Sequence, residues 1–349
     1  MKAAVWYGKN DVRVEARALK QLGDDELKIK VAWAGICGSD LHEYHEGPVF
    51  IPVNSPDPVT GCQAPLTLGH EFAGVVEEVG SSVTKFKVGD RISIYPMITK
   101  EQRSSKEDVF DGFGTFGLHV DGGFAEYAVI PEKYAYILPD SMSLEEGALV
   151  EPTAVAVQAV KEANLLIGDS VAVFGSGPIG LLTIMAAKTA GATNIIAIDV
   201  SETRLEKAIQ AGATHIIHAG QKDVIKEIRK VCPDGADITF EVAGVDATFK
   251  QAIQATKIRG LVMVVSIFSS SINWNPFELT TSGVKICATL AYERITFQQT
   301  IELIASGQLP AKQIITDRIE LENIVENGFE TLIHDKSQAK ILVRLSGDN

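Results

Sequence analysis

The chain has 349 residues, of which 45 are acidic and 32 basic, so its formal net charge is −13. This balance argues against nucleic acid or an anionic membrane surface as a partner, because both repel an acidic protein. Hydrophobic residues make up 46% and charged residues 22% of the chain, which is typical of a globular protein with little disorder. A chain of this length predicts two domains.

No run of eighteen apolar residues is present, which argues against a membrane-spanning helix. The first eight residues turn polar too soon for a signal peptide. The four cysteines, at positions 37, 62, 232 and 287, form no regular framework. Such scatter is not typical of disulfide-bonded secreted domains, so we expect a cytoplasmic protein.

The first 150 residues combine short strands with glycine-rich turns. Leu27–Val31 alternates in polarity as a half-buried strand does, and Phe72–Gly80 and Val88–Ile92 are typical of further strands. Glu46–Thr67 contains five prolines, which predicts a long loop, and the charged segment Lys100–Asp111 is expected to face solvent. This half therefore predicts an all-β, barrel-like unit.

Two glycine-rich motifs in this half contain side chains that suit zinc. Gly35–His42 includes Cys37, and Gly69–Glu71 includes His70. A thiolate and an imidazole are favoured zinc ligands, and a catalytic zinc has three protein ligands and one open position. Zinc bound here would polarise the oxygen of an alcohol.

The third ligand is expected to be a carboxylate, either Glu71 or Glu151. Neighbouring residues of a strand point to opposite faces. This favours Glu151 as the ligand and gives Glu71, next to His70, a supporting or exchanging role. Ser39 is a candidate to accept the proton of the alcohol, and His42 to pass it to solvent.

From about residue 169, strands alternate with helices. Apolar strand-like runs lie at Ser170–Phe174, Asn194–Asp199, Asp237–Val242 and Gly260–Val265, with a helix over Glu202–Gly212 and a last strand over Ala339–Leu345. This alternation predicts an α/β fold with a doubly wound parallel sheet.

The segment Gly175-Ser176-Gly177-Pro178-Ile179-Gly180 follows a predicted strand and opens a predicted helix. This pattern is typical of a loop that binds the pyrophosphate of a dinucleotide. Asp199 ends the next strand, where a carboxylate accepts from ribose hydroxyls and repels a 2′-phosphate, which favours NAD over NADP. Arg204 either flanks the adenine or is an ordinary surface charge.

Five motifs together resemble those of the zinc-dependent medium-chain alcohol and polyol dehydrogenases, over essentially the whole chain. They are Gly35–His42, Gly69–Glu71, Asp121–Tyr127, Glu151-Pro152 and Gly175–Gly180. The resemblance implies a GroES-like catalytic domain over residues 1–153 and 293–349 and a Rossmann domain over residues 154–292. It also implies assembly into a homo-oligomer, a dimer or tetramer, through the edge of the Rossmann sheet near Gly260–Phe268 and Lys285–Tyr292.

The same resemblance implies that the zinc ligands are Cys37, His70 and Glu151, with Glu71 close to the metal. It implies that Ser39 and His42 form a proton relay. It also implies that Phe268 lies beside the cofactor. Many members bind a second, structural zinc through four cysteines near residues 95–110. This chain has no cysteine between Cys62 and Cys232, so one catalytic zinc per chain is expected.

The proline-rich loop and the stretch Phe240–Gly244 are similar to a subgroup that interconverts 2,3-butanediol and acetoin. The expected substrate is therefore a small vicinal diol or hydroxyketone. Oxidation of a sorbitol-type polyol or of L-threonine is the alternative within enzymes. A catalytically inert nucleotide-binding protein of the same fold is the alternative outside them.

Overall fold

The computed structural model describes residues 1–99 and 109–346, so most of the charged segment Lys100–Asp111 lies outside the described residues. The chain forms two compact units. The first comprises Met1–Pro152, Phe297–Ala305 and Ile315–Asn349, and the second comprises Thr153–Thr296 and Ser306–Ile314. Packing units need not coincide with domains in the evolutionary sense, and the predicted domain boundaries stay a prediction.

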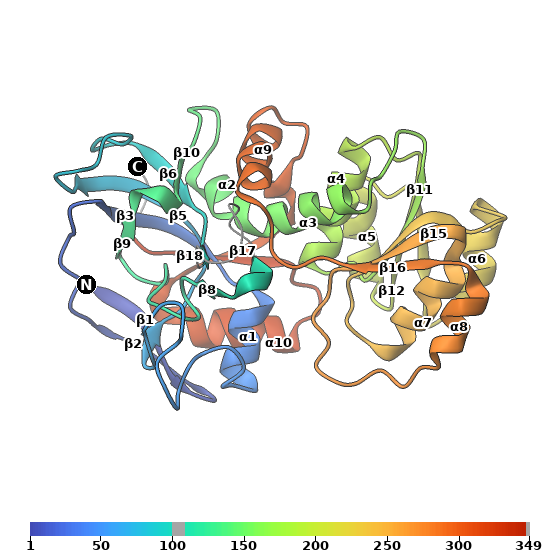
Figure 1. Cartoon of the computed structure of the whole chain (residues 1–349), viewed down its shortest axis with the longest axis horizontal. Coiled ribbons are helices and arrows are strands. Elements are labelled where there is room, and N and C mark those ends of the chain that lie inside the picture. Colours follow the sequence, from blue (N-terminus) through green and yellow to red (C-terminus); the bar gives the residue numbers. More distant parts are fainter. Residues whose placement is uncertain (100–108, 347–349) are drawn as a thin grey trace. The chain divides into compact units, whose positions relative to one another are not determined.

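The first unit is built mainly of short strands (Figure 1). One sheet has the order β2 (Asp11–Ala16), β1 (Lys2–Gly8), β4 (Leu66–Thr67). The largest sheet has the order β10 (Ala135–Ile137), β6 (Arg91–Ile94), β5 (Glu71–Val79), β3 (Glu26–Gly35), β18 (Lys340–Arg344), β17 (Ile315–Glu320), and β9 (Tyr127–Pro131) also pairs with β3. A hairpin joins β7 (Met97–Thr99) to β8 (Phe113–Thr115).

The helices of this unit are short. They are α1 (Gly38–His45), α2 (Leu144–Ala148) and α10 (Thr331–His334), with turns η1 (Val109–Asp111), η2 (Glu132–Tyr134), η4 (Leu321–Asn323) and η5 (Ile324–Glu330). Two longer helices, α3 (Val150–Glu162) and α9 (Arg294–Ala305), contain residues of both units. The predicted strand over Leu27–Val31 is confirmed within β3, and that over Phe72–Gly80 is confirmed as part of β5 up to Val79.

The central strand β3 brings the two metal motifs together. Its last residue, Gly35, pairs with Glu71 of β5 on one side and with Leu342 of β18 on the other. The chain then turns directly into Cys37 and α1. Residues far apart in the sequence therefore meet at this end of the sheet.

The segment Glu46–Thr67 is largely loop, as predicted, but its last two residues form β4, which pairs with β1. The first part of the loop is fixed by Glu43, a fully buried residue of α1. Its carboxylate accepts hydrogen bonds from the amides of Val49 and Ile51 at 3.1 Å, and also from the amide of Phe50. This end of the loop is thus tied to the helix that follows Cys37.

The second unit contains a six-stranded parallel sheet, which confirms the predicted architecture. Its order is β13 (His215–His218), β12 (Asn194–Asp199), β11 (Ser170–Phe174), β14 (Ala236–Glu241), β15 (Thr256–Val264), β16 (Lys285–Ala288). The helices are α4 (Pro178–Thr189), α5 (Glu202–Ala211), α6 (Val224–Val231), α7 (Asp246–Ala255) and α8 (Pro276–Ser282), with the turn η3 (Ala311–Ile314).

The strand order reverses between β11 and β14. The chain begins in the middle at β11, runs outward to β13, and then returns to β14 on the other side of β11. Right-handed crossovers place α4 and α5 on one face of the sheet and α6 and α7 on the other (Figure 1). In sheets of this kind, ligands bind at the carboxyl ends of the strands where the order reverses.

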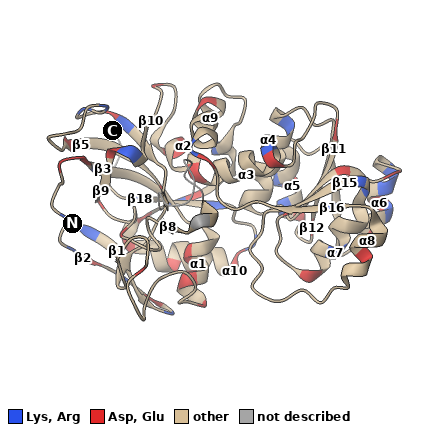
Figure 2. Ribbon diagram, viewed as in Figure 1, with Lys and Arg blue, Asp and Glu red and all other residues tan. Residues whose placement is uncertain are grey.

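Basic and acidic residues are interspersed along both units (Figure 2). The lysines and arginine of α6 stand out, but Lys226 pairs with Asp223 and Lys230 with Glu227. Over residues 1–99 and 109–346, no helix is long and apolar enough to cross a membrane.

Candidate active site

Cys37 is the residue that precedes α1. The carboxylate of Asp40, in the first turn of this helix, accepts a hydrogen bond of 2.9 Å from the amide of Cys37 and so fixes the backbone there. The Cys37 side chain is half-buried and not in a disulfide.

His70 follows Gly69, a position where the backbone conformation and the lack of space both favour glycine. Gly69 has φ +94°, and a Cβ on it would lie 2.8 Å from the backbone of Phe124. The imidazole is buried and lies between two polar groups of α1. Its Nε2 lies 3.2 Å from Oγ of Ser39, and its Nδ1 lies 3.7 Å from Oδ1 of Asp40.

His70 and Asp40 face each other across 3.7 Å. Nδ1 of His70 and Oδ1 of Asp40 are buried, and neither has a hydrogen-bond partner among the described residues. Histidines that ligate a metal usually donate their other ring nitrogen to a carboxylate or a carbonyl. Asp40 is placed to be that carboxylate, with Nε2 left to face a metal.

Burial and neighbouring charges shift the pKa values of both members of this pair. Burial raises the pKa of the Asp40 carboxyl to about 6, against the opposing effect of His70. Burial alone would lower the pKa of His70, but the charges of Asp40 and Cys37 outweigh it, so that the pKa lies well above its usual value. The surroundings of the imidazole therefore attract positive charge, which a divalent metal ion supplies.

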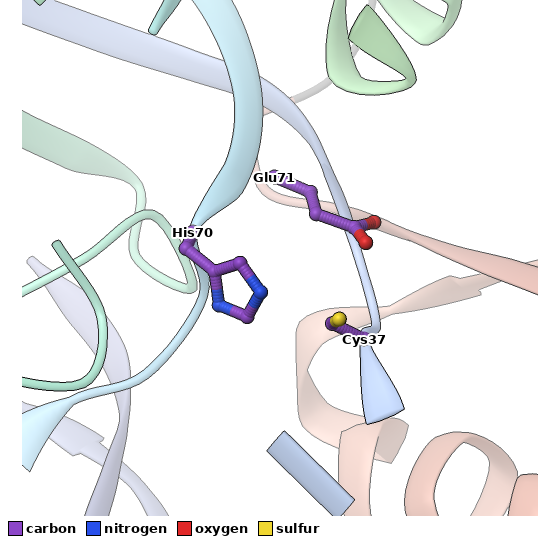
Figure 3. Close-up of side chains that lie close together, drawn as sticks. All are labelled: Cys37, His70 and Glu71. Carbon is purple, nitrogen blue, oxygen red and sulfur yellow. The ribbon is translucent and has the colours of Figure 1, made fainter. Parts of the chain in front are cut away.

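Glu71 completes a group of three side chains that lie close together (Figure 3). One ligand atom each from Cys37, His70 and Glu71 lies within 4.8 Å of the other two. The carboxylate of Glu71 is fully buried. A Cβ on Gly35, its partner in β3, would lie 2.1 Å from Oε2 of Glu71. The glycine at position 35 thus makes room for this carboxylate.

Lys340 of β18 holds Glu71 in place. Its buried Nζ donates to both carboxylate oxygens at 2.7 Å and to the carbonyl oxygen of Ile36 at 2.8 Å. Burial acts to lower the pKa of Lys340, but the negative charges of Glu71 and Cys37 raise it above the usual value. The ammonium therefore stays charged and forms a buried ion pair with Glu71.

Glu151 lies in the first turn of α3 and is buried. Its charge contributes to raising the pKa of both His70 and Lys340, so it acts on the same buried group. The available donors are a thiolate, an imidazole and two carboxylates, which is the set that zinc takes in catalytic sites. The residues present therefore fit zinc.

The two predicted relay residues are both on α1. The structure brings Oγ of Ser39 to within 3.2 Å of Nε2 of His70. His42 is one turn further along, and its side chain is 38% exposed. Its Nδ1 lies 3.4 Å from a carboxylate oxygen of Glu46. Ser39 thus lies inside the cluster, whereas His42 lies at the boundary with solvent.

The glycine-rich segment of the second unit forms a tight turn between β11 and α4. Gly175 has φ +105°. Gly177 precedes the helix, and Pro178 is its first residue. A Cβ on Gly180 would lie 2.0 Å from the carbonyl oxygen of Gly175, so the helix packs directly on the turn. This is the backbone geometry that binds a pyrophosphate at a helix N-terminus.

Asp199 ends β12 beside this turn. Its Oδ2 accepts from the amide of Ser176 at 2.8 Å, and its Oδ1 accepts from the amide of Ser201 at 2.9 Å. The carboxylate therefore supports the turn. Each oxygen has a second lone pair with which to accept from a ribose hydroxyl.

Three further residues are predicted to bind the cofactor: Ile179, Arg204 and Phe268. The side chains of Ile179, in the first turn of α4, and of Arg204, in the first turn of α5, are half-buried. Phe268 packs edge-on against Phe249 with ring centroids 6.2 Å apart. This contact gives Phe268 a place in the core of the second unit, and its contact with a cofactor stays a prediction.

Known proteins resemble this chain over nearly its whole length. The profile of the alcohol dehydrogenase GroES-like domain matches residues 23–140, and that of the zinc-binding dehydrogenases matches residues 178–306. (R,R)-butanediol dehydrogenase of Bacillus subtilis is 43% identical over 345 residues, which are 99% of each chain. Sorbitol dehydrogenase of Bacillus subtilis is 34% identical, over 98% of this chain and 97% of the relative.

Solved structures agree with these matches. A crystal structure of 2R,3R-butanediol dehydrogenase from Bacillus subtilis has a TM-score of 0.94 and covers 98% of this chain and 99% of that chain. A Sinorhizobium meliloti protein assigned as a zinc-binding dehydrogenase and solved with NADP is 29% identical. Its TM-score is 0.88, over 98% of both chains. The chain belongs to the zinc-binding alcohol dehydrogenases, oxidoreductases with a GroES-like domain and a Rossmann-type domain that use zinc and a nicotinamide cofactor.

Proposed function

We propose that this protein is an NAD-dependent, zinc-dependent dehydrogenase that interconverts 2,3-butanediol and acetoin. The observation that carries the proposal is the 43% identity, over 99% of both chains, with a dehydrogenase named for (R,R)-butanediol. The buried group of Cys37, His70 and acidic residues supplies the chemistry that such a reaction needs.

Cys37, His70 and Glu151 are the proposed ligands of a single zinc ion. Both oxygens of Glu71 accept from Lys340, which weakens its attraction for a second cation and supports Glu151 as the third ligand. Glu71 would then be a carboxylate close to the metal, in a supporting or exchanging role. No cysteine lies between Cys62 and Cys232, which supports one zinc per chain.

A matched pair of variants tests this assignment. Glu151→Ala is expected to lower zinc content in purified protein more than Glu71→Ala does, because only the first removes a ligand. Metal content is measured by elemental analysis after dialysis against a weak chelator. The reverse ranking would assign the third ligand to Glu71.

The residues around the zinc handle the proton of the alcohol. When bound, zinc supplies a Lewis acid that favours loss of this proton. Oγ of Ser39, at Nε2 of His70, is placed to accept it. His42, three residues along the same helix and partly exposed, passes it to solvent. NAD, when bound, would supply the nicotinamide ring that accepts the hydride of the secondary carbon.

The cofactor is proposed to be NAD, bound by Gly175, Gly177, Pro178, Ile179, Gly180, Asp199, Arg204 and Phe268. Asp199 supports this choice, because a carboxylate at the end of β12 repels a 2′-phosphate. Its bonds to Ser176 and Ser201 hold it beside the glycine-rich turn.

Substrate choice is proposed to depend on the loop Glu46–Thr67, which Glu43 ties to α1. The deciding measurement is kcat/KM with NAD for 2,3-butanediol, sorbitol, L-threonine and a simple secondary alcohol. We expect butanediol to be the best substrate. Sorbitol is the second candidate, because a sorbitol dehydrogenase is 34% identical to this chain. No turnover of any alcohol by zinc-loaded protein would favour an inert nucleotide-binding protein.

We also propose a cytoplasmic homo-oligomer, a dimer or tetramer, with domain boundaries at residues 153/154 and 292/293. Four unpaired cysteines suit a reducing compartment.

β16 is an edge strand of the parallel sheet with exposed Lys285 and Cys287. An edge strand can pair with that of a second copy. Light scattering during size-exclusion chromatography tests the oligomeric state, and a monomer would refute it.

A further inference from the structure

A fully buried carboxylate lies where the strand order of the parallel sheet reverses. Glu241 is the last residue of β14. In the sheet register it pairs with Phe174 of β11, the residue that precedes Gly175. Neither the zinc chemistry nor the glycine-rich turn uses this carboxylate, although it lies at the edge where such sheets bind nucleotides.

The side chain of Glu241 is surrounded by donors. Oε1 accepts from the amides of Ala243 at 3.1 Å and Gly244 at 3.0 Å, and from the hydroxyl of Thr248 at 2.6 Å. Oε2 accepts from the hydroxyl of Ser266. A buried carboxylate is costly unless its charge is met by such bonds. The donors are amides and hydroxyls, and together they satisfy both carboxylate oxygens of Glu241.

These bonds join two loops. Ala243 and Gly244 belong to the loop after β14, and Ser266 belongs to the loop after β15. The carbonyl oxygen of Glu241 also accepts from the amide of Val265 at 2.9 Å. One residue thus fixes both loops through its side chain and its backbone.

The loop after β14 lies close to the glycine-rich turn and to the loop after β15. A Cβ on Gly175 would lie 3.1 Å from the amide nitrogen of Ala243. A Cβ on Gly244, at φ +71°, would lie 2.7 Å from the carbonyl oxygen of Ile267. A shift of the loop after β14 would therefore move backbone that touches the glycine-rich turn.

We propose that Glu241 is a positioning residue for the nicotinamide cofactor. It holds the loops after β14 and β15 in the conformation that binds the dinucleotide, without touching the dinucleotide itself. This inference rests on the proposed use of NAD.

Glu241→Gln tests the inference, because it retains the size of the side chain but replaces one acceptor oxygen with an NH₂ donor. Titration of the holoenzyme with NADH, followed by fluorescence, should show a Kd raised about tenfold or more, as expected for a lost bond to a charged acceptor. Zinc content should be unchanged. Ser266→Ala and Thr248→Ala, which each remove one donor and leave the carboxylate, should raise the Kd about threefold.

Thr239→Val is the matched control. Thr239 lies two residues earlier in β14, is equally buried, and pairs with the hydroxyl of Thr256 at 2.8 Å. The control should lower Tm and leave the Kd for NADH unchanged. The inference is overturned if Glu241→Gln binds NADH as the wild type does, or if the Kd of the control rises equally for an equal loss of Tm.

If Glu241→Gln does not fold, the two hydroxyl variants decide, and wild-type affinity in both would overturn the inference. A wild-type protein that does not bind NADH at all would overturn the proposed function first. These two failures are therefore distinguishable.

Discussion

Replacing Lys340 with methionine should separate the electrostatic role of this lysine from its packing. Methionine has a similar length and no charge, so the variant leaves Glu71 buried with neither of its two 2.7 Å bonds from Nζ. Removing one partner of a buried ion pair costs about 3–5 kcal/mol of the free energy of unfolding. For a protein of this size, that lowers Tm by on the order of 10 °C.

The assay is thermal unfolding of chelator-treated and zinc-loaded protein. We expect the deficit to be larger without zinc, because a metal ion replaces part of the positive charge that Lys340 supplied. The double variant Glu71→Leu/Lys340→Met removes both charges and should be more stable than Lys340→Met alone. A Tm of the single variant within about 2 °C of the wild type, or a double variant at least as unstable as the single one, would refute this reasoning.

Wild-type protein purified without added metal should contain one zinc ion per chain, and a content of two would contradict this prediction. Cys37→Ala or His70→Ala should each remove the zinc and abolish turnover. The circular dichroism spectrum of both variants should match that of the wild type. Asp199→Ser should reduce the preference for NAD over NADP by about tenfold, the effect of removing a like charge near the 2′-phosphate, whereas a wild type that prefers NADP would contradict the assignment. Ser39→Ala should lower kcat for alcohol oxidation by about 10²-fold and His42→Ala by about tenfold, most strongly below neutral pH. Unchanged pH–rate profiles in both variants would exclude the relay.

Regular strands and helices were predictable where periodicity and turn residues agreed. The helix predicted over Glu202–Gly212 ends at Ala211, because Gly212 takes a left-handed conformation and closes it. The strand predicted over Val88–Ile92 begins only at Arg91. Gly89, with φ +94°, is part of the turn before it.

Short edge strands gave no periodic signal. β13 has four residues, two of which are histidines, and it forms only because β12 offers it a parallel partner. β4 has two residues at the end of a proline-rich loop and pairs with β1. In both cases, tertiary pairing decides the conformation.

The sequence also predicted the Cys37 and His70 motifs but missed two residues that act on them. Asp40 was visible as an acidic residue in the first turn of a helix after a cysteine. Its place beside Nδ1 of His70 required the packing of α1 against the start of β5. Lys340 had no local signal, because it reaches Glu71 only through the pairing of β18 with β3.

These two missed residues explain how the cluster can exist before a metal binds. Cys37, Asp40, Glu71 and Glu151 are four acidic groups that lie at or act on one buried region, and Lys340 is a fixed cation in contact with one of them. Lys340 neutralises the charge of Glu71. Around His70, negative charge remains in excess of positive charge. A zinc ion bound as proposed would meet this excess of negative charge. One carboxylate is thus paired with a permanent cation, and the other acidic groups attract the metal. Replacing Lys340 should therefore lower Tm most in the metal-free protein.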